Sequence, residues 1–435
     1  MTAAITACRA CGGETLRPFL SLGKTPLADA LVRPDDIDAA EQRFPLEVAF
    51  CEECTLVQIL HDVPPQTLFV DNYLYFSSFS DHLLEHSRAH ATNLITSRGL
   101  GEDSLVVELA SNDGYLLKNF AEQGIPVLGI DPAPDQAAVA IENGIPTLVE
   151  FFGVEVAQRL RAEGKQADVI IANNVMAHVP DLDSFVGGMA ELIADDGLIT
   201  VENPWVHDLV QHAEFDTIYH EHFSYYSCTS VHNLMRRHGL FLNDVEYFPD
   251  LHGGTLRWHC GPVEDVSDRV REFTALEEAE GVTGFAYYAD FGERVQANID
   301  ALRALLIERR AAGRTIAAYG AAAKGSTLLN ASGIGTDLLD FVVDRNVHKH
   351  GLMMPGVHVP VRPTEALLEE QPDDVLILAW NFADEIVAQQ AEYVRRGGTF
   401  LVPVPTPAEL QQAVQSPGGS NVGGAAEDTQ TEALS

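Results

Sequence analysis

The sequence predicts an α/β protein with a small metal-binding N-terminal domain, a central Rossmann-like domain and a C-terminal Rossmann-like domain. Three observations support this prediction. The chain has 435 residues, which exceeds the usual size of one core. Two series of short apolar runs alternate with helix-length segments, as in parallel sheets covered by helices. Two close cysteine pairs stand near the N-terminus, ahead of both series.

The N-terminal domain, residues 1–70, holds the two pairs. Cys8 and Cys11 form one C-x2-C unit, and Cys51 and Cys54 form the other, 39 residues later. Four thiolates at this spacing can close a tetrahedral zinc site. The segment is rich in Gly and Pro and too small for a core of its own, and a structural metal commonly stabilises such domains. The alternatives are two unrelated pairs or a redox pair, because the spacer is longer than in most zinc ribbons.

The central domain, residues 71–260, opens with a predicted helix near 80–99. Short apolar strands follow, and their separation by helix-length segments predicts a doubly wound sheet. These runs lie at 105–110, 126–130, 147–152, 167–175 and 197–204.

The C-terminal domain, residues 261–408, begins with a long helical stretch near 264–312. A second series of apolar runs follows, so we expect a second Rossmann-like sheet. The runs lie at 314–320, 337–344, 373–380 and 398–405. Residues 409–435 contain mostly small and acidic residues and are expected to be a disordered tail.

The formal net charge of −37 argues against nucleic acid as a partner, because a polyanion would be repelled. No run of apolar residues reaches the length of a membrane span, and no signal peptide is evident, so we expect a cytoplasmic protein without membrane contact. Cys228 and Cys260 are expected to be buried packing residues. A monomer is the working expectation for the oligomeric state.

The first strand of the central domain runs into the turn Ser111-Asn112-Asp113-Gly114, where a cofactor is expected. The second strand ends at Asp131, whose carboxylate could bind ribose hydroxyls of NAD or S-adenosylmethionine. The turn lacks the three glycines that accommodate a pyrophosphate, and its acidic residues suit a cationic sulfonium. These residues favour a methyl donor; the alternative is an acidic turn without a cofactor.

A cluster of histidine and tyrosine follows the fifth strand, in the segment Tyr219-His220-Glu221-His222-Phe223-Ser224-Tyr225-Tyr226. A histidine could remove a proton from a carbon beside a ketone, and tyrosine hydroxyls could stabilise the enolate. Metal binding is a weaker alternative because H-E-H lacks the H-E-x-x-H spacing. Histidines that only pack in the core are the other alternative.

The chain up to about residue 405 resembles the three-domain sugar C-methyltransferases of deoxysugar pathways. The matching segments are CRACGG, LGKTPLADAL, CEECTLVQ, YLYFSSFSDH, ELASNDGYLL, GIDPA, NNVMAHVPD, IYHEHFSYYS, HGGTLR, YGAAAKG, DRN and VPVP. The resemblance implies a zinc domain, a domain that binds S-adenosylmethionine, and a C-terminal domain that helps hold a thymidine-diphosphate 4-keto sugar.

The resemblance also implies roles for residues. His222 matches the base, and Tyr219, Glu221 and a tyrosine of YLYFSS match residues lining the reaction site; Tyr73 is preferred to Tyr75. The expected cofactor residues are Glu108, Ala110, Ser111, Asn112, Gly114, Asp131 and Asn173. The expected substrate residues are Tyr75, His252, Gly253 and Lys324, and a tight turn and a plain helix start are the alternatives for the last three.

Two other functions remain open at this stage. An O-methyltransferase of a sugar or another small molecule would use the same cofactor and also benefit from a base. A zinc-stabilised protein that binds a nucleotide without catalysing a reaction would need neither the methyl donor nor a base. A dehydrogenase is disfavoured by the turn at 111–114, which lacks the dinucleotide fingerprint. The particular sugar, the methylated carbon and the stereochemistry do not follow from these residues.

Overall fold

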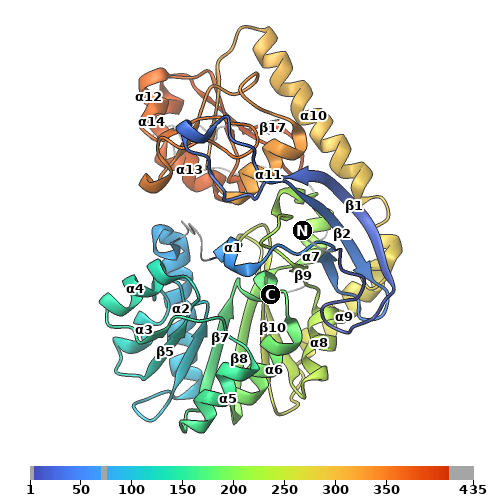
Figure 1. Cartoon of the computed structure of the whole chain (residues 1–435), viewed down its shortest axis with the longest axis vertical. Coiled ribbons are helices and arrows are strands. Elements are labelled where there is room, and N and C mark those ends of the chain that lie inside the picture. The colour runs from blue at the N-terminus through green and yellow to red at the C-terminus, as the bar shows by residue number, and fades with distance from the viewer. Residues whose placement is uncertain (1–3, 70–75, 411–435) are drawn as a thin grey trace, which may run out of the picture.

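The structure is a computed structural model that describes residues 4–69 and 76–410. Tyr73 and Tyr75 therefore lie outside the described residues, as do residues 411–435, which are nearly all of the expected tail. The described chain forms an N-terminal sheet, a central α/β domain and a C-terminal α/β domain (Figure 1). The α/β prediction is confirmed.

The N-terminal sheet is antiparallel and has the order β1-β2-β3-β9. Its strands are β1 (Leu16–Thr25), β2 (Phe44–Cys51), β3 (Val57–Ile59) and β9 (Ser224–Tyr225), and the helix α1 (Pro65–Phe69) follows β3. The last strand comes from the central domain and pairs Tyr225 with Val57. A strand more than 160 residues away in sequence thus completes this sheet.

The central sheet has seven strands in the order β10-β11-β8-β7-β4-β5-β6. Its bounds are β4 (Val106–Leu109), β5 (Val127–Ile130), β6 (Thr147–Leu148), β7 (Ala167–Asn173), β8 (Ile193–Pro204), β10 (Phe241–Phe248) and β11 (Thr255–Gly261). The five predicted strands are all present and parallel. The antiparallel pair β10 and β11 was not predicted, because charged residues interrupt its apolar pattern.

Helices cover both faces of the central sheet (Figure 1). They are α2 (Asp81–Arg98), α3 (Lys118–Ala121), α4 (Pro134–Glu142), α5 (Val154–Ala162), α6 (Leu182–Leu192) and α8 (Cys228–Arg237). The short helix α7 (Val206–Gln211) packs instead in the core shared with the N-terminal sheet. The predicted first helix matches α2, which starts after Ser80 as N-cap and ends at Gly99 in the left-handed conformation.

The C-terminal sheet has six strands in the order β14-β13-β12-β15-β16-β17. They are β12 (Ile316–Tyr319), β13 (Val342–Asp344), β14 (Val361–Pro363), β15 (Asp374–Ile377), β16 (Thr399–Val402) and β17 (Ala408–Glu409). Its helices are α10 (Phe291–Ala311), α11 (Ala323–Ser332), α12 (Ala366–Glu370), α13 (Ala383–Gln389) and α14 (Ala391–Arg395). α9 (Asp268–Glu280), which the sequence assigned to this domain, packs instead on α8 and β10, because its apolar residues Val270 and Phe273 are buried in the core of the central domain. The expected long helix is two helices, because Gly281 ends the first at φ 83°.

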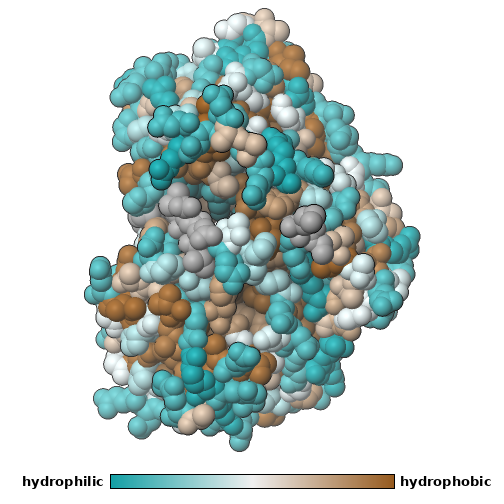
Figure 2. Space-filling view, viewed as in Figure 1, coloured by the Kyte–Doolittle hydropathy of each residue, from teal (hydrophilic) through white to brown (hydrophobic). Residues whose placement is uncertain are grey.

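Short 3-10 helices occupy several connections: η1 (Pro34–Asp36), η2 (Ser77–Phe79), η3 (Met176–His178), η4 (Phe215–Thr217), η5 (Phe285–Tyr287), η6 (Val347–Lys349) and η7 (Trp380–Phe382). Figure 2 shows an indentation between the upper and lower lobes of the molecule. Within the described chain, no helix combines the length and the apolar character that crossing a bilayer requires.

The cores do not follow the sequence domains strictly. Cys8, Cys51 and Cys54 belong to the same hydrophobic core as Met176 and Tyr226 of the central domain. The cysteine segment therefore packs on the central domain and shares its core. Cys228 and Cys260 are fully buried in this core, as predicted.

Candidate active site and metal centre

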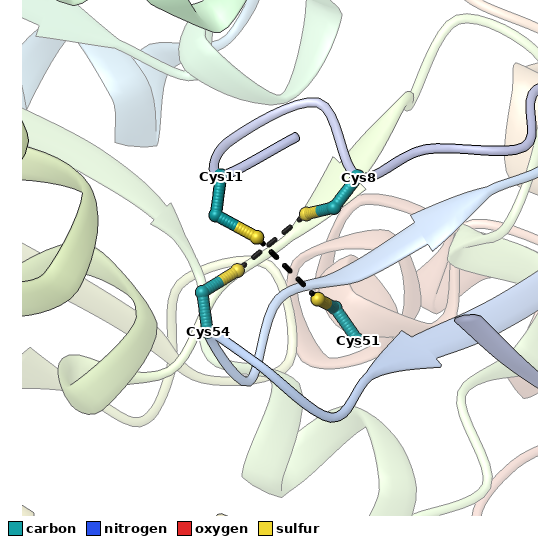
Figure 3. Close-up of side chains that lie close together, drawn as sticks. All are labelled: Cys8, Cys11, Cys51 and Cys54. Carbon is teal, nitrogen blue, oxygen red and sulfur yellow. Dashed lines mark hydrogen bonds between the residues drawn. The ribbon is translucent and has the colours of Figure 1, made fainter. Parts of the chain in front are cut away.

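The four paired cysteines form one metal centre. Their side chains point toward one another (Figure 3), and all four sulfur atoms lie within 4.8 Å of one another. The Sγ atoms of Cys8 and Cys54 are 3.5 Å apart, and those of Cys11 and Cys51 are 3.7 Å apart. Zinc–sulfur bonds of about 2.3 Å in a tetrahedron place sulfurs about 3.8 Å apart. The arrangement therefore fits a closed, structural zinc ion.

Each C-x2-C unit is a tight turn of the same design. The amide of Gly12 donates to the Cys8 carbonyl at 2.9 Å, and the amide of Thr55 donates to the Cys51 carbonyl at 2.9 Å. The residue after each second cysteine adopts a left-handed conformation, with φ 73° at Gly12 and 67° at Thr55. This reversal lets both cysteines of a pair reach one ion.

The predicted cofactor turn leaves the carboxyl end of β4. Ala110 and Asn112 adopt φ 55° and 49°, which turns the backbone sharply. The carboxylate of Asp131, at the end of β5, accepts hydrogen bonds from the amides of Asn112 at 2.7 Å and Ala133 at 2.8 Å. Asp131 thereby fixes the turn next to the place where a ribose is expected.

Buried polar atoms gather around this turn. Among the described residues, Glu108 Oε2, Ser111 Oγ, Asp113 Oδ1 and Asn173 Oδ1 are buried and have no hydrogen-bond partner. Burial, helped by the carboxylates of Asp131 and Asp113, raises the pKa of Glu108 well above its usual value, and burial raises the pKa of Asp131 to about 6. Acceptors and repelling carboxylates of this kind fit a ligand with cationic groups and hydroxyls.

The segment after residue 75 covers the turn. The side chain of Asn112 accepts a hydrogen bond from the Ser77 amide at 2.9 Å, and that of Asp113 accepts one from the Ser78 amide at 3.3 Å. Gly114 serves packing, because a Cβ there would lie 3.0 Å from Ile145. Gly114 thus has a structural reason besides the predicted cofactor role.

His222 lies in an irregular loop between η4 and β9. Its Nδ1 is 2.8 Å from the Thr217 carbonyl oxygen, and its Nε2 is 2.9 Å from the hydroxyl of Tyr219. A carbonyl only accepts, so Nδ1 carries the hydrogen and Nε2 presents a lone pair. The arrangement orients a neutral imidazole with Nε2 toward Tyr219.

His178, at the end of η3, stands beside His222, with ring centroids 4.8 Å apart. Its Nδ1 donates to the carbonyl of Glu221 at 2.8 Å. Burial, and then the nearby His178, lower the pKa of His222 well below its usual range, and burial lowers the pKa of His178 to about 4. Both rings are therefore neutral at pH 7.

The carboxyl of Glu221 is 4% exposed, and its Oε2 has no hydrogen-bond partner. Burial and the nearby Asp29 raise the pKa of Glu221 to about 8. Glu221 is thus mostly protonated at neutral pH and can donate as well as accept a hydrogen bond.

The C-terminal domain brings Lys324 to this region. Its Nζ donates to the carbonyl of His252 at 3.4 Å and lies 4.4 Å from the ring centre of Trp380. The positive charge of Lys324 also contributes to the lowered pKa of His222. Lys324 is in the first turn of α11.

The loop at 252–254 has left-handed residues throughout, with φ 55° at His252, 90° at Gly253 and 116° at Gly254. A Cβ on Gly253 would lie 2.5 Å from the carboxylate of Glu214. Glycine is therefore required there by Glu214, whatever the substrate contacts.

The structure brings most of the expected residues to two neighbouring places. One is the turn at 110–114 with Asp131 and Asn173, and the other joins the loop of His222 to His252 and Lys324. Sequence reasoning missed His178 and Thr217. His178 could have been noticed, because it follows closely after the strand that ends at Asn173. The Thr217 contact could not, because it uses a backbone carbonyl, which every residue type has.

Comparisons with known proteins show which family this chain belongs to. Three family models match in order along the chain: a zinc binding domain at 8–69, a methyltransferase domain at 82–243 and a C-methyltransferase C-terminal domain at 250–405. The C-methyltransferase NovU of Streptomyces niveus is 37% identical over 409 residues, covering 93% of this chain and 96% of NovU. This chain belongs to the C-methyltransferase family.

Other similarities cover only part of the chain. A ubiquinone biosynthesis O-methyltransferase of Azorhizobium caulinodans is 27% identical over 28% of this chain and 47% of its own length. Magnesium protoporphyrin IX methyltransferase of Synechocystis PCC 6803 with bound SAH gives a TM-score of 0.33, with 12% identity over 45% of this chain and 90% of that chain.

The family settles the broad function. The protein is an S-adenosylmethionine-dependent C-methyltransferase, and its cofactors are S-adenosylmethionine and zinc. The orphaned buried acceptors around the turn after β4 agree with such a cationic cofactor.

Proposed function

We propose that the enzyme methylates a carbon beside the ketone of a nucleotide-linked 4-keto deoxysugar, of the thymidine-diphosphate type, with His222 as base. The observation that carries the proposal is the fixed tautomer of His222, whose Nε2 presents a lone pair in a buried site. The resemblance of the surrounding motifs to sugar C-methyltransferases supports the substrate class.

In the proposed reaction, His222 Nε2 takes a proton from the carbon beside the ketone. The electrons of that C–H bond form the enolate, and the carbonyl π electrons move to oxygen. Tyr219 moves its hydrogen bond from Nε2 to this oxygen and stabilises its charge. When bound, S-adenosylmethionine would supply an electrophilic methyl group. The enolate carbon would form the new carbon–carbon bond as the ketone re-forms, and the electrons of the broken sulfur–methyl bond would stay on sulfur in S-adenosylhomocysteine. His222 releases its proton to solvent, which makes the proton beside the ketone exchangeable with deuterated water.

The cofactor is proposed to lie against Glu108, Ala110, Ser111, Asn112, Gly114, Asp131 and Asn173. The nucleotide sugar is proposed to lie against the loop at 252–254 and Lys324, which contact each other directly. Lys324 carries a positive charge where the net charge of the chain is −37, so it is suited to offset a diphosphate. Tyr73 and Tyr75, which lie outside the described residues, keep their predicted roles beside the sugar.

Calorimetric titration with S-adenosylhomocysteine and with thymidine diphosphate, each alone and with the other present, tests the proposal first. Two independent saturable sites are expected. Purified zinc-loaded enzyme should then exchange the proton beside the ketone of a 4-keto sugar nucleotide with deuterated water, and His222→Asn should abolish the exchange while retaining S-adenosylhomocysteine binding. Exchange at the wild-type rate in His222→Asn, or methyl transfer to oxygen, would overturn the proposal.

A further inference from the structure

We propose that Arg9, between the first two zinc ligands, is a positioning residue that holds the loop of His222 in place through Phe223. The proposal rests on the proposed function only in giving His222 the role of base. Arg9 itself touches neither of the proposed ligand sites. Its effect would pass through the backbone next to His222.

Arg9 is a charged residue whose side chain is buried in the small N-terminal domain. Its side chain is 4% exposed although it carries a charge. The guanidinium donates to the carbonyls of Ile59 at 3.3 Å and Pro180 at 3.4 Å, and it pairs with the carboxylate of Asp62. These contacts join the zinc turn to β3 and to the segment after η3. Burying a charge is costly without such partners, so the three contacts form one organised site.

The same guanidinium lies over the ring of Phe223, with Cζ 5.0 Å from the ring centre. Phe223 is the residue after His222, and it is fully buried. A desolvated cation over an aromatic ring is attracted more strongly than the same pair exposed to water. Arg9 therefore holds the Phe223 ring against the N-terminal domain.

The backbone of Phe223 is also held on two sides. Its carbonyl accepts from the Ile59 amide at 3.0 Å, and its amide donates to the Ala177 carbonyl at 2.7 Å. The next residue, Ser224, pairs with Gln58 of β3. The side chain of Gln58 in turn accepts from the Arg9 amide at 2.9 Å. The zinc turn and the loop of His222 are thus connected both through Arg9 and through β3.

The zinc ion makes the turn that carries Arg9 rigid, and this turn is where the connection to the loop of His222 begins. Both neighbours of the Arg9–Ala10 dipeptide, Cys8 and Cys11, are metal ligands, so the turn that carries Arg9 cannot shift without distorting the zinc site. A displacement of about 1 Å in a reacting group can cost about 10²-fold in rate. Arg9 is fixed between two zinc ligands and contacts Phe223, the residue after His222, so it can prevent such a displacement of His222.

Arg9→Met tests the proposal, because it keeps an unbranched apolar stem and removes the charge and the hydrogen bonds of the side chain. Hydrogen exchange of peptides spanning 215–226 should become at least several-fold faster with zinc still bound, and kcat should fall about 10²-fold with KM changed less than threefold. Arg9→Lys, which retains the charge, should recover part of kcat. Unchanged exchange at 215–226 in zinc-loaded Arg9→Met would overturn the proposal.

Arg17→Met is the matched control. Arg17 lies in the same domain, pairs with Glu52 and stacks on Phe285, and its side chain is 49% exposed. The Arg17→Met variant should keep the zinc content, the hydrogen exchange at 215–226 and the kcat of the wild type. Equal effects of Arg17→Met and Arg9→Met would show a general weakening of the domain and would overturn the proposal.

A double-mutant cycle with Phe223→Leu separates positioning from general loss of stability. If Arg9 acts through Phe223, the effects of Arg9→Met and Phe223→Leu on exchange are not additive, whereas additive effects overturn the proposal. Should Arg9→Met lose zinc, Arg9→Lys takes its place in the cycle. Zinc content and hydrogen exchange need no substrate, so they test the proposal even if the proposed sugar or base is wrong.

Discussion

The hydroxyl of Tyr219 lies 2.9 Å from Nε2 of His222. Because Nδ1 of His222 donates to the Thr217 carbonyl, the hydroxyl must donate to Nε2 and not accept from it. Tyr219 therefore donates to the lone pair of His222 that we propose as the base, and we propose that this hydrogen bond passes to the substrate oxygen during the reaction.

Replacing Tyr219 by phenylalanine should lower kcat by about 10²-fold, because a donor to the developing oxyanion is lost. The affinity for S-adenosylhomocysteine, measured by calorimetry, should change less than twofold. Tyr287→Phe is a suitable control, since the Tyr287 hydroxyl bonds to Gln211 and the His207 carbonyl away from the proposed base. Wild-type kcat in Tyr219→Phe would contradict the role.

Glu221→Gln should change how stability depends on pH. Burial raises the folded-state pKa of Glu221 to about 8, above the usual value of 4.5. The folded protein thus binds the proton more strongly, and the wild type loses stability as the pH rises from about 4.5 to about 8. Glutamine removes this loss, so urea unfolding should favour the variant by up to about 1.4 kcal/mol more per pH unit in that window. A difference that is constant with pH would refute the prediction.

Asp131→Asn should weaken S-adenosylhomocysteine binding by about tenfold or more, equivalent to about 1.4 kcal/mol. The change removes a charged acceptor from the amides of Asn112 and Ala133 and a proposed partner of the ribose. Asp135→Asn, four residues further on and exposed, should leave the affinity unchanged in the same titration. Equal affinities in all three proteins would exclude Asp131 from the site.

Thr55→Gly should stabilise the zinc-loaded protein by about 1 kcal/mol. Thr55 is β-branched and stands at φ 67°, a conformation that glycine adopts without strain. The reciprocal change Gly12→Thr, at φ 73° in the other zinc turn, should destabilise by a similar amount. Chemical denaturation at saturating zinc measures both, and a loss of stability in Thr55→Gly would show that the strain is not relieved.

Much of the fold could be predicted because its signals are local. The parallel strands from β4 to β8 contain mainly apolar runs, which is typical of a sheet covered on both faces. The α2 boundaries follow from Ser80 and Gly99. The antiparallel pair β10 and β11 escaped prediction because Asp244, Glu246 and Arg257 interrupt its pattern and are paired only in three dimensions.

Within the candidate site, the types of the residues allowed a prediction of which residues take part. They did not reveal which hydrogen-bond partners each of these residues has. The zinc ligands follow from the C-x2-C spacing, since a metal selects thiolates at that separation. His222 stands out as a histidine among tyrosines. Its orientation by the Thr217 carbonyl and the neighbourhood of His178 cannot be seen in the sequence, because a backbone carbonyl is common to every residue.

The sequence by itself determined the two C-x2-C pairs of zinc ligands and the family, because the chemistry of residues at short, fixed spacings carries both, and it predicts the cofactor turn on the same grounds. Only the tertiary structure decided that the zinc segment shares the core of the central domain, that β9 completes the N-terminal sheet, and that Arg9 reaches Phe223. These contacts join residues far apart in the chain, and long-range packing with buried hydrogen bonds selects them, not local preference.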